Sequence, residues 1–158
     1  MSASVIPDPL HLLLIEDDEV DIEAVRRALR RSGMDQNILH VATDGEEALD
    51  MLRGKNGYRS LPQPCVMLVD INMPRMNGLE FLKEVRNDKN LSHNIAFMLT
   101  TSGRKDDKIY AQTLNAAGYF MKENLTEFID LLRFYCNINE FPVRAMTPQA
   151  DLPTAATA

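Results

Sequence analysis

The sequence is poor in cysteine, which limits its covalent framework. Only Cys65 and Cys136 occur among 158 residues, too few for the dense disulfide framework that small secreted domains need. Cys65 precedes an apolar run, and Cys136 lies within a helical pattern. We therefore expect both to act as small buried hydrophobic residues in a reducing compartment.

The sequence also lacks an excess of basic residues. Its 17 Lys and Arg are outnumbered by 23 Asp and Glu, which gives a net charge of −6. Nucleic acids and anionic membranes attract cationic surfaces. We therefore expect partners that are proteins or cations, with no nucleic acid and no membrane.

Long apolar runs are absent as well. No apolar run approaches the roughly 20 residues that span a membrane, and the start, MSASVIPDPL, lacks the basic and apolar regions of a signal peptide. These absences predict a cytoplasmic protein. With 45% apolar and 25% charged residues, the composition is that of a globular domain.

Five short apolar runs alternate with longer amphipathic segments. We expect strands over residues 11–15, 37–42, 65–69, 95–99 and 118–121. Helical spacing of apolar residues predicts one helix that ends at Gly33 and others over about 44–53, 77–87, 106–115 and 125–141. This alternation is typical of a doubly wound parallel α/β sheet. The third and fourth runs are continuously apolar, which predicts central strands.

The chain divides into three parts on this interpretation. Residues 1–9 form an N-terminal arm, and residues 10–141 form one domain that ends in an extended helix. Residues 142–158 are rich in Pro, Ala and Thr without apolar periodicity, which predicts a disordered tail. We expect no DNA-binding output domain.

Charged and hydroxyl side chains follow the apolar runs, at the ends that meet along one edge of a parallel sheet. They are Glu16, Asp17 and Asp18 after the first run, Asp70 after the third, Thr100 after the fourth and Lys122 after the fifth. At ~4 Å and an effective dielectric of ~20, two like charges repel by about 4 kcal/mol. One lysine cannot offset the three carboxylates of Glu16, Asp17 and Asp70, whereas Mg²⁺ favours such a set of oxygen ligands.

Each of these residues has a simpler explanation when taken alone. An acid just after a strand is commonly a helix N-cap, which we favour for Asp18. Thr100 alone would be a loop hydroxyl, and Lys122 alone a solvated surface lysine. Only the whole set of residues, in this order along the chain, specifically indicates a functional site.

Four motifs together carry a resemblance to a known family. LLLIEDDE, VMLVDINMPRMNGLEFLKEVR, MLTTSG and GYFMK resemble the acid-pair, phosphoacceptor, switch-hydroxyl and lysine motifs of response-regulator receiver domains. The resemblance covers about residues 10–137. It implies a flavodoxin-like doubly wound sheet of five parallel strands, in the order 2-1-3-4-5, with five helices.

The resemblance also implies residue roles. Asp70 is similar to the aspartate that accepts a phosphoryl group from a sensor histidine kinase. Mg²⁺ would be held by Glu16, Asp17, Asp70 and the backbone carbonyl of Asn72. Thr100 and Lys122 would contact the phosphoryl oxygens, and Tyr119 matches the aromatic that packs inward when the hydroxyl moves. Such a protein is a phosphoacceptor switch that performs only self-phosphotransfer and autodephosphorylation.

One departure concerns the residue after the switch lysine. Receivers usually carry a proline there in a cis peptide, whereas Glu123 and Asn124 follow Lys122. A cis bond without proline costs ~3 kcal/mol, so the sequence leaves this geometry open. The same departure, together with the insert KNGYRSLPQPC, the segment TTSGRKDD and the ending NEFP, resembles short receivers paired with phytochrome-type kinases.

Three alternatives compete with this interpretation, and the residues fit each of them less well. A haloacid-dehalogenase-like phosphatase would need a second acid at Asn72 and its nucleophile on the first strand. A flavin or nucleotide binder would need a glycine-rich cradle where IEDDE stands. The third alternative is a pseudo-receiver that acts only as a protein-binding module.

The last predicted helix, capped by Asn124, shows two apolar stripes. At ~100° per residue, one stripe suits docking on the sheet and contains Leu125, Phe128, Ile129, Leu132, Tyr135 and Cys136. The other contains Leu131, Phe134, Ile138 and Phe141. Scattered exposed residues or a tail folded over them would explain the second stripe, but a contiguous patch is better explained as an interface. We expect a symmetric homodimer.

Overall fold

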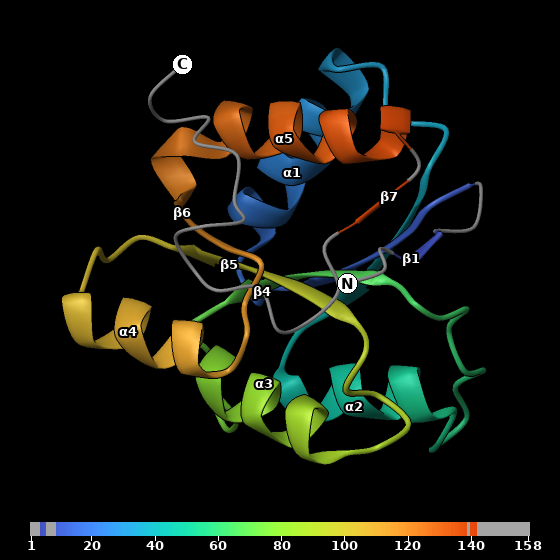
Figure 1. The fold of residues 1–158 in the computed structure, drawn as a ribbon, viewed down its shortest axis with the longest axis vertical. Helices are drawn as coiled ribbons and strands as arrows, with labels where there is room; N and C mark the ends of the chain where they lie inside the picture. The colour runs from blue at the N-terminus through green and yellow to red at the C-terminus, as the bar shows by residue number, and fades with distance from the viewer. Residues whose placement is uncertain (1–3, 6–8, 139, 142–158) are drawn as a thin grey trace.

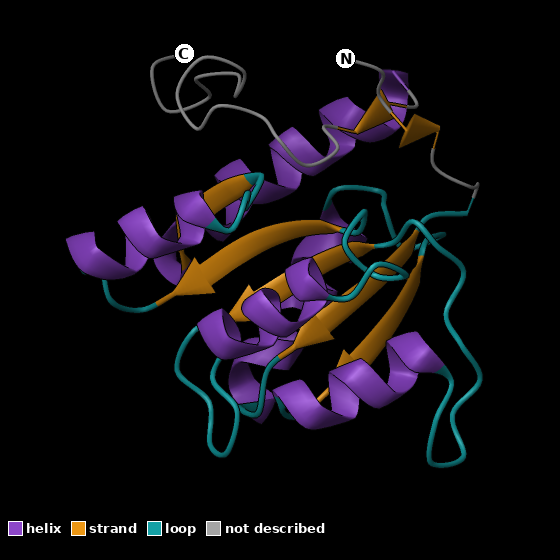
Figure 2. Cartoon of the chain, turned by 60° about the horizontal axis from the view of Figure 1, so that its bottom comes forward, coloured by secondary structure: helices purple, strands orange, loops and turns teal. Residues whose placement is uncertain are grey.

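The computed structural model describes residues 4–5, 9–138 and 140–141. Its centre is a five-stranded parallel sheet with helices on both faces (Figures 1 and 2). The strands are β2 (His11–Ile15), β3 (Ile38–Ala42), β4 (Val66–Asp70), β5 (Ile95–Thr100) and β6 (Gly118–Met121). Their order is β3-β2-β4-β5-β6. This is the predicted order 2-1-3-4-5, which confirms the flavodoxin-like α/β fold.

The helices lie close to their predicted ranges. They are α1 (Glu19–Arg31), α2 (Gly45–Arg53), α3 (Gly78–Asn87), α4 (Lys105–Thr113) and α5 (Leu125–Ile138), with a 3-10 turn η1 over Lys122–Asn124. Local signals explain three of these boundaries. The Asp44 side chain caps α2, which ends where Gly54 takes a φ of 70°. Asn77 and Glu80 form a capping box at the start of α3.

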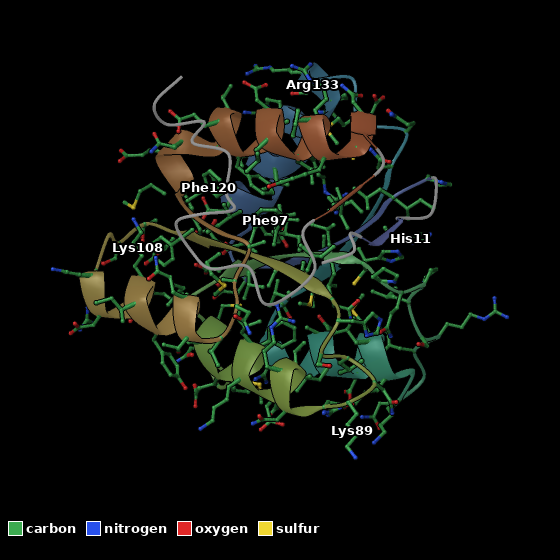
Figure 3. All side chains as sticks on the ribbon, in the orientation of Figure 1. His11, Lys89, Phe97, Lys108, Phe120 and Arg133 are labelled. Atoms are coloured by element: carbon green, nitrogen blue, oxygen red, sulfur yellow. The ribbon has the colours of Figure 1, made fainter. Side chains whose placement is uncertain are left out.

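Two hydrophobic cores lie on opposite faces of the sheet. Helices α1 and α5 cover one face, while α2, α3 and α4 cover the other (Figure 1). Every residue of β4 and β5 is buried, as predicted for central strands. On the α5 side, Phe97 packs against Phe128 with ring centroids 5.2 Å apart, and Phe120 also packs against Phe128. Figure 3 labels Phe97 and Phe120. Cys65 is buried in the other core, and Cys136 is half-buried.

The predicted end of the last helix is wrong. Helix α5 ends at Ile138, and β7 (Glu140–Phe141) pairs antiparallel with β1 (Ser4–Val5) of the N-terminal arm. Phe141 therefore lies on a strand whose backbone pairs with the N-terminal arm, with Ser4 opposite Phe141. The proline that follows Phe141 in the sequence also disfavours helical geometry at this residue. The predicted disordered tail, residues 142–158, lies outside the described residues.

The predicted exposure of Leu131 is also wrong. Only 5% of Leu131 is exposed, because α5 packs against α1 as well as against the sheet and so buries a wider arc than one stripe. Phe134 is 49% exposed, as predicted for the outer stripe. The side chains of Ile138 and Phe141 lie outside the described set. Within the residues that the structure describes, no helix is long and apolar enough to cross a membrane.

Candidate functional site

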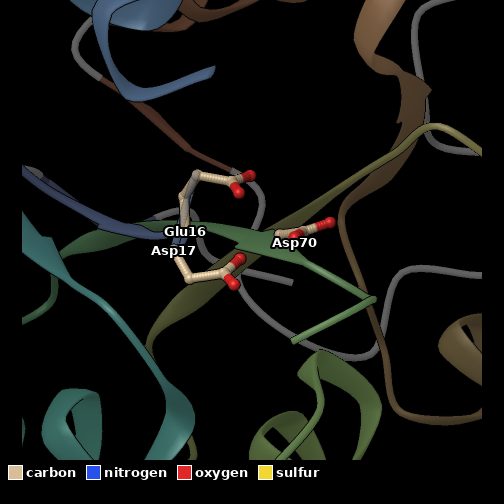
Figure 4. Close-up of side chains that lie close together, drawn as sticks. All are labelled: Glu16, Asp17 and Asp70. Carbon is tan, nitrogen blue, oxygen red and sulfur yellow. The ribbon is translucent and has the colours of Figure 1, made fainter. Parts of the chain in front are cut away.

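Three carboxylates meet at the carboxyl edge of the sheet. Glu16 and Asp17 follow β2, and Asp70 is the last residue of β4, the neighbouring strand. One carboxylate oxygen of each lies within 4.8 Å of the others, and Figure 4 shows the three side chains approaching the same space. Glu16 and Asp70 are buried, whereas Asp17 is exposed. The sequence prediction that these three residues lie together is confirmed.

Lys122 brings its ammonium group into this cluster. It begins the η1 turn directly after β6. Its Nζ lies 2.6 Å from Glu16 Oε2, 2.8 Å from Asp21 Oδ2 and 3.4 Å from Asp70 Oδ1. Among the described residues the only cis peptide bond is Gln63–Pro64, so the bond after Lys122 is trans. Lys122 thus reaches the acids without the proline that receivers usually carry.

Asp18 has the role that its position in the sequence favoured. Its carboxylate accepts hydrogen bonds from the backbone N–H groups of Val20 (2.8 Å) and Asp21 (3.3 Å), and so caps α1. Its own backbone N–H donates to Glu16 Oε1 at 3.1 Å. Asp18 therefore shapes the loop that presents Glu16 and lies outside the carboxylate cluster.

Burial shifts the ionisation of this cluster. It raises the pKa of Glu16 to about 7, more than the hydrogen bonds from Lys122 and Asp18 lower it. It also raises the pKa of Asp70, with Lys122 acting in the opposite direction. For Lys122, burial lowers the pKa, but the Asp21 and Glu16 carboxylates outweigh it and the net shift is upward. The folded site therefore disfavours its own negative charge and favours a cation.

Thr100 and Tyr119 converge on one carbonyl oxygen. Thr100 ends β5 and is fully buried. Its Oγ1 donates to the Ser102 carbonyl oxygen at 3.2 Å and accepts from the Ser102 N–H at 3.1 Å. The Tyr119 hydroxyl donates to the same carbonyl oxygen at 3.2 Å. Thr100 thus lies at the predicted edge, but its hydroxyl binds the loop between β5 and α4.

The loop after Asp70 is held close to the acid cluster. The backbone N–H of Asn72 donates to Asp70 Oδ1 at 3.4 Å, and the Gly78 N–H donates to the Ile71 carbonyl oxygen at 3.0 Å. A Cβ atom at Gly78 would collide with the Asp70 carbonyl oxygen. Glycine at this position therefore lets α3 begin against the end of β4 and fixes the backbone from which Asp70 projects.

The donor set fits a hard divalent cation. Three carboxylates supply oxygen ligands within 4.8 Å of one another, which is the chemistry that Mg²⁺ selects. Lys122 offsets part of their charge, and burial of Glu16 and Asp70 makes the remainder costly.

Sequence reasoning missed Asp21. It lies in the first turn of α1, where acidic side chains ordinarily complement the helix dipole, so nothing in its local pattern set it apart. One signal could have identified Asp21. It lies in the first turn of the helix that directly follows Glu16 and Asp17, and that turn begins beside the carboxylate cluster.

Comparison with known proteins agrees with this geometry. Residues 12–133 match the response regulator receiver domain. The chain is similar to the response regulator Rcp1 of Synechocystis sp., with 30% identity over 139 residues, 88% of this chain and 92% of Rcp1.

Solved structures show the same likeness. The Mn²⁺-bound form of Rcp1 has a TM-score of 0.71 and 27% identity, covering 87% of this chain and 100% of that one. The bacteriophytochrome response regulator AtBRR has a TM-score of 0.70 and 31% identity, covering 89% and 98%. The chain therefore belongs to the response regulator receiver family and is related to phytochrome response regulators.

Proposed function

We propose that the chain accepts a phosphoryl group on Asp70 from a sensor histidine kinase, with Mg²⁺ bound by Glu16, Asp17, Asp70 and the Asn72 carbonyl. The observation that carries this proposal is the convergence of Asp70 with two further acids and Lys122 at the end of a central strand. Only Asp70 among the three acids projects from the end of β4, beside Lys122 and the loop to α3.

In the proposed transfer, an Asp70 carboxylate oxygen attacks the phosphorus of a phosphohistidine. The new O–P bond forms as the N–P bond breaks, and the imidazole of the kinase leaves. Bound Mg²⁺ supplies neutralisation of the charge that develops on the phosphoryl oxygens. Lys122 donates hydrogen bonds to the same oxygens. The chain acts on no separate substrate, so turnover is limited to its own phosphotransfer and dephosphorylation.

The Ser102 carbonyl offers a simple switch. This carbonyl oxygen accepts hydrogen bonds from the hydroxyl groups of both Thr100 and Tyr119. We propose that Thr100 turns toward a phosphoryl oxygen, and that Tyr119 gives up its own hydrogen bond to this carbonyl and moves inward into the space that the Thr100 hydroxyl vacates. The loop after β5 then shifts, and the surface formed by α4 and α5 changes its shape for a protein partner.

The proposed kinase is phytochrome-type. Two observations support this: the likeness to AtBRR, a bacteriophytochrome response regulator, and the sequence features shared with short receivers of that kind. The chain itself works in the cytoplasm in this proposal, with proteins as partners.

The test is incubation with acetyl phosphate and Mg²⁺, followed by intact-mass measurement and peptide mapping. We expect the mass of one phosphoryl group on the peptide that contains Asp70, and none for Asp70→Asn. The matched control is Asp44→Asn, since Asp44 is also a buried aspartate and asparagine also caps a helix. Full labelling of Asp70→Asn would contradict the proposal. Failure of the unmodified chain to take up label would also contradict it and would favour a pseudo-receiver.

We also propose a symmetric homodimer through the outer face of α5, centred on Phe134. A 49% exposed phenylalanine on this helix supports the proposal. Phe134→Arg should give a folded monomer by sedimentation, whereas Ile38→Arg, at a 39% exposed apolar residue on edge strand β3, should leave the dimer intact. A monomeric unmodified chain at high concentration, with and without beryllofluoride, would contradict it.

A further inference from the structure

The ammonium group of Lys122 is shared unequally among three carboxylates. It donates to Glu16 at 2.6 Å and to Asp21 at 2.8 Å, while Asp70 lies at 3.4 Å. The proposed phosphoacceptor is thus the most distant of its three partners. An ammonium group has three N–H donors, and two of them are directed at acids other than Asp70.

Asp21 holds Lys122 from the α1 side of the site. It lies in the first turn of α1, and its own backbone N–H is bound by the Asp18 cap, which fixes where that turn begins. The Asp21 side chain is 34% exposed and that of Lys122 is 16% exposed. Their contact is therefore partly shielded from water, so solvent weakens it less than it weakens a fully exposed pair.

A small cavity lies beside this contact. It measures about 30 Å³, and Glu16, Asp21 and Lys122 line it together with apolar side chains of β2, α1, β5 and α5. This volume is large enough for one water molecule. Asp70 and Asp17 are not among the lining residues. Lys122 therefore extends between two environments: the α1 side with Asp21, and the cluster side with Asp70.

We propose that Asp21 is a positioning residue that holds the Lys122 ammonium toward α1 and opposes its move onto a phosphoryl group on Asp70. This inference rests on the proposed function, since it concerns the response of the same site to phosphorylation. Two effects act in the same direction. Asp21 competes for an N–H donor of Lys122, and its negative charge repels the incoming phosphoryl oxygens.

As a consequence, the site has a lower affinity for a phosphoryl group on Asp70 than it would have without the Asp21 carboxylate. When a phosphoryl oxygen is placed on Asp70, Lys122 must loosen its hydrogen bond to Asp21 to reach it. Asp21 thus biases the equilibrium between the unphosphorylated and phosphorylated arrangements without touching the reacting atoms.

The test compares two ligands on one variant. Beryllofluoride, added with saturating Mg²⁺, should bind Asp21→Asn about fivefold more tightly than the unmodified chain, the size expected for loss of one partly exposed ion pair. Mg²⁺ alone should bind the variant equally or more weakly, because a nearby negative charge is gone. Asp21→Glu should restore the lower beryllofluoride affinity. The matched control, Glu19→Gln, removes an exposed carboxylate from the same turn and should change beryllofluoride affinity less than twofold.

A double-mutant cycle ties the effect to Lys122. In a Lys122→Met background, Asp21→Asn should no longer strengthen beryllofluoride binding. Equal or weaker binding of beryllofluoride by Asp21→Asn would overturn the inference, as would a gain that persists in the Lys122→Met background. A parallel loss of both affinities and of thermal stability would show a merely structural role and also overturn it. If the unmodified chain binds no beryllofluoride and takes up no label from acetyl phosphate, the proposed function falls and this inference with it.

Discussion

At the amino edge of the sheet a buried amide is held by neutral partners, whereas at the carboxyl edge buried acids face one another. Asn94 is fully buried just before β5, where its Oδ1 accepts from the Cys65 N–H at 2.9 Å and its Nδ2 donates to Gln63 Oε1 at 3.0 Å. Glu16 and Asp70 are almost as buried, yet they share Lys122 and lie within reach of Asp17.

The ionisation of the two edges differs accordingly. Burial raises the pKa of the Cys65 thiol to about 12, so this group stays neutral and unreactive at the amino edge. Burial also raises the pKa of Asp70 and Glu16, but these acids lie where a cation and a phosphoryl group are proposed to bind. This difference indicates that the amino edge stabilises the fold, whereas the carboxyl edge retains the electrostatic cost of buried carboxylates, which a bound cation can lower.

The largest expected effect comes from breaking the amino edge. Asn94→Ala should lower the free energy of unfolding by about 3 kcal/mol, because it leaves the buried Cys65 N–H without its acceptor. Urea unfolding measures this loss. The exposed Asn90→Ala in the same loop should change stability by less than about 0.5 kcal/mol. A small loss for Asn94→Ala would contradict the structural role that we assign to this edge.

Binding of the proposed Mg²⁺ to the carboxylates of the carboxyl edge should have the next largest effect on stability. Mg²⁺ at about ten times its dissociation constant should stabilise the folded chain by about 1.4 kcal/mol, seen as a higher Tm. Asp17→Ala should lose most of this increment. Asp18→Ala should keep it, although loss of the α1 cap itself costs about 1 kcal/mol. Equal losses of the increment in both variants would show that the acid pair is misassigned.

Removal of the charge on Asp70 should stabilise the chain. Without Mg²⁺ near neutral pH, Asp70→Asn should be more stable by about 1 kcal/mol, as is common when a functional-site charge is removed. Because folding raises the pKa of Asp70, the penalty exists above that raised pKa and disappears as pH falls toward the ordinary aspartate value. Urea unfolding along a pH series measures the gap. A gap that widens on acidification would contradict this account.

The smallest expected effect concerns a histidine pair at the start of β2. His11 Nδ1 and His40 Nε2 lie 3.0 Å apart with stacked rings. Burial, and then the charge of His11, lowers the pKa of His40. The unfolded chain therefore binds this proton more readily, and stability is lost as pH falls through the ordinary histidine value of about 6.5.

Substitution of His40 should flatten that pH dependence. His40→Gln should show a smaller decline in unfolding free energy between about pH 7 and about pH 5. The control His93→Gln, in the loop before β5, leaves the pair in place and should retain the decline. An identical slope for His40→Gln and the unmodified chain would refute the role of the pair.

Much of the site could be predicted because its signals are local. A polar residue directly after an apolar run reports a strand end, and the parallel sheet then brings Glu16, Asp17, Asp70 and Lys122 to one edge. Asp21 could not be predicted in the same way, since an acid in a first helical turn is ordinary. Its contact with Lys122 joins residues 101 positions apart in the chain.

The errors at the last helix have a common physical origin. An argument from helical periodicity assumes that a helix packs against one flat surface. Helix α5 instead packs against both the sheet and α1, and Leu131 is buried in the core that these elements share. Periodicity also continued to Phe141, where pairing with Ser4 of the arm replaced the helix. The partners of Asn94 could not be predicted either, because they join separate segments of the chain through tertiary packing.

The most direct test of the contrast between the two edges is amide NMR of the chain titrated with beryllofluoride and Mg²⁺. We predict that chemical-shift changes concentrate at the carboxyl edge, around Asp70, Thr100 and Lys122, and extend through Ser102 to α4. Signals around Asn94 at the amino edge should stay in place. Changes spread evenly over both edges, or confined to the amino edge, would contradict the claim that the carboxyl edge is the phosphoryl-binding switch.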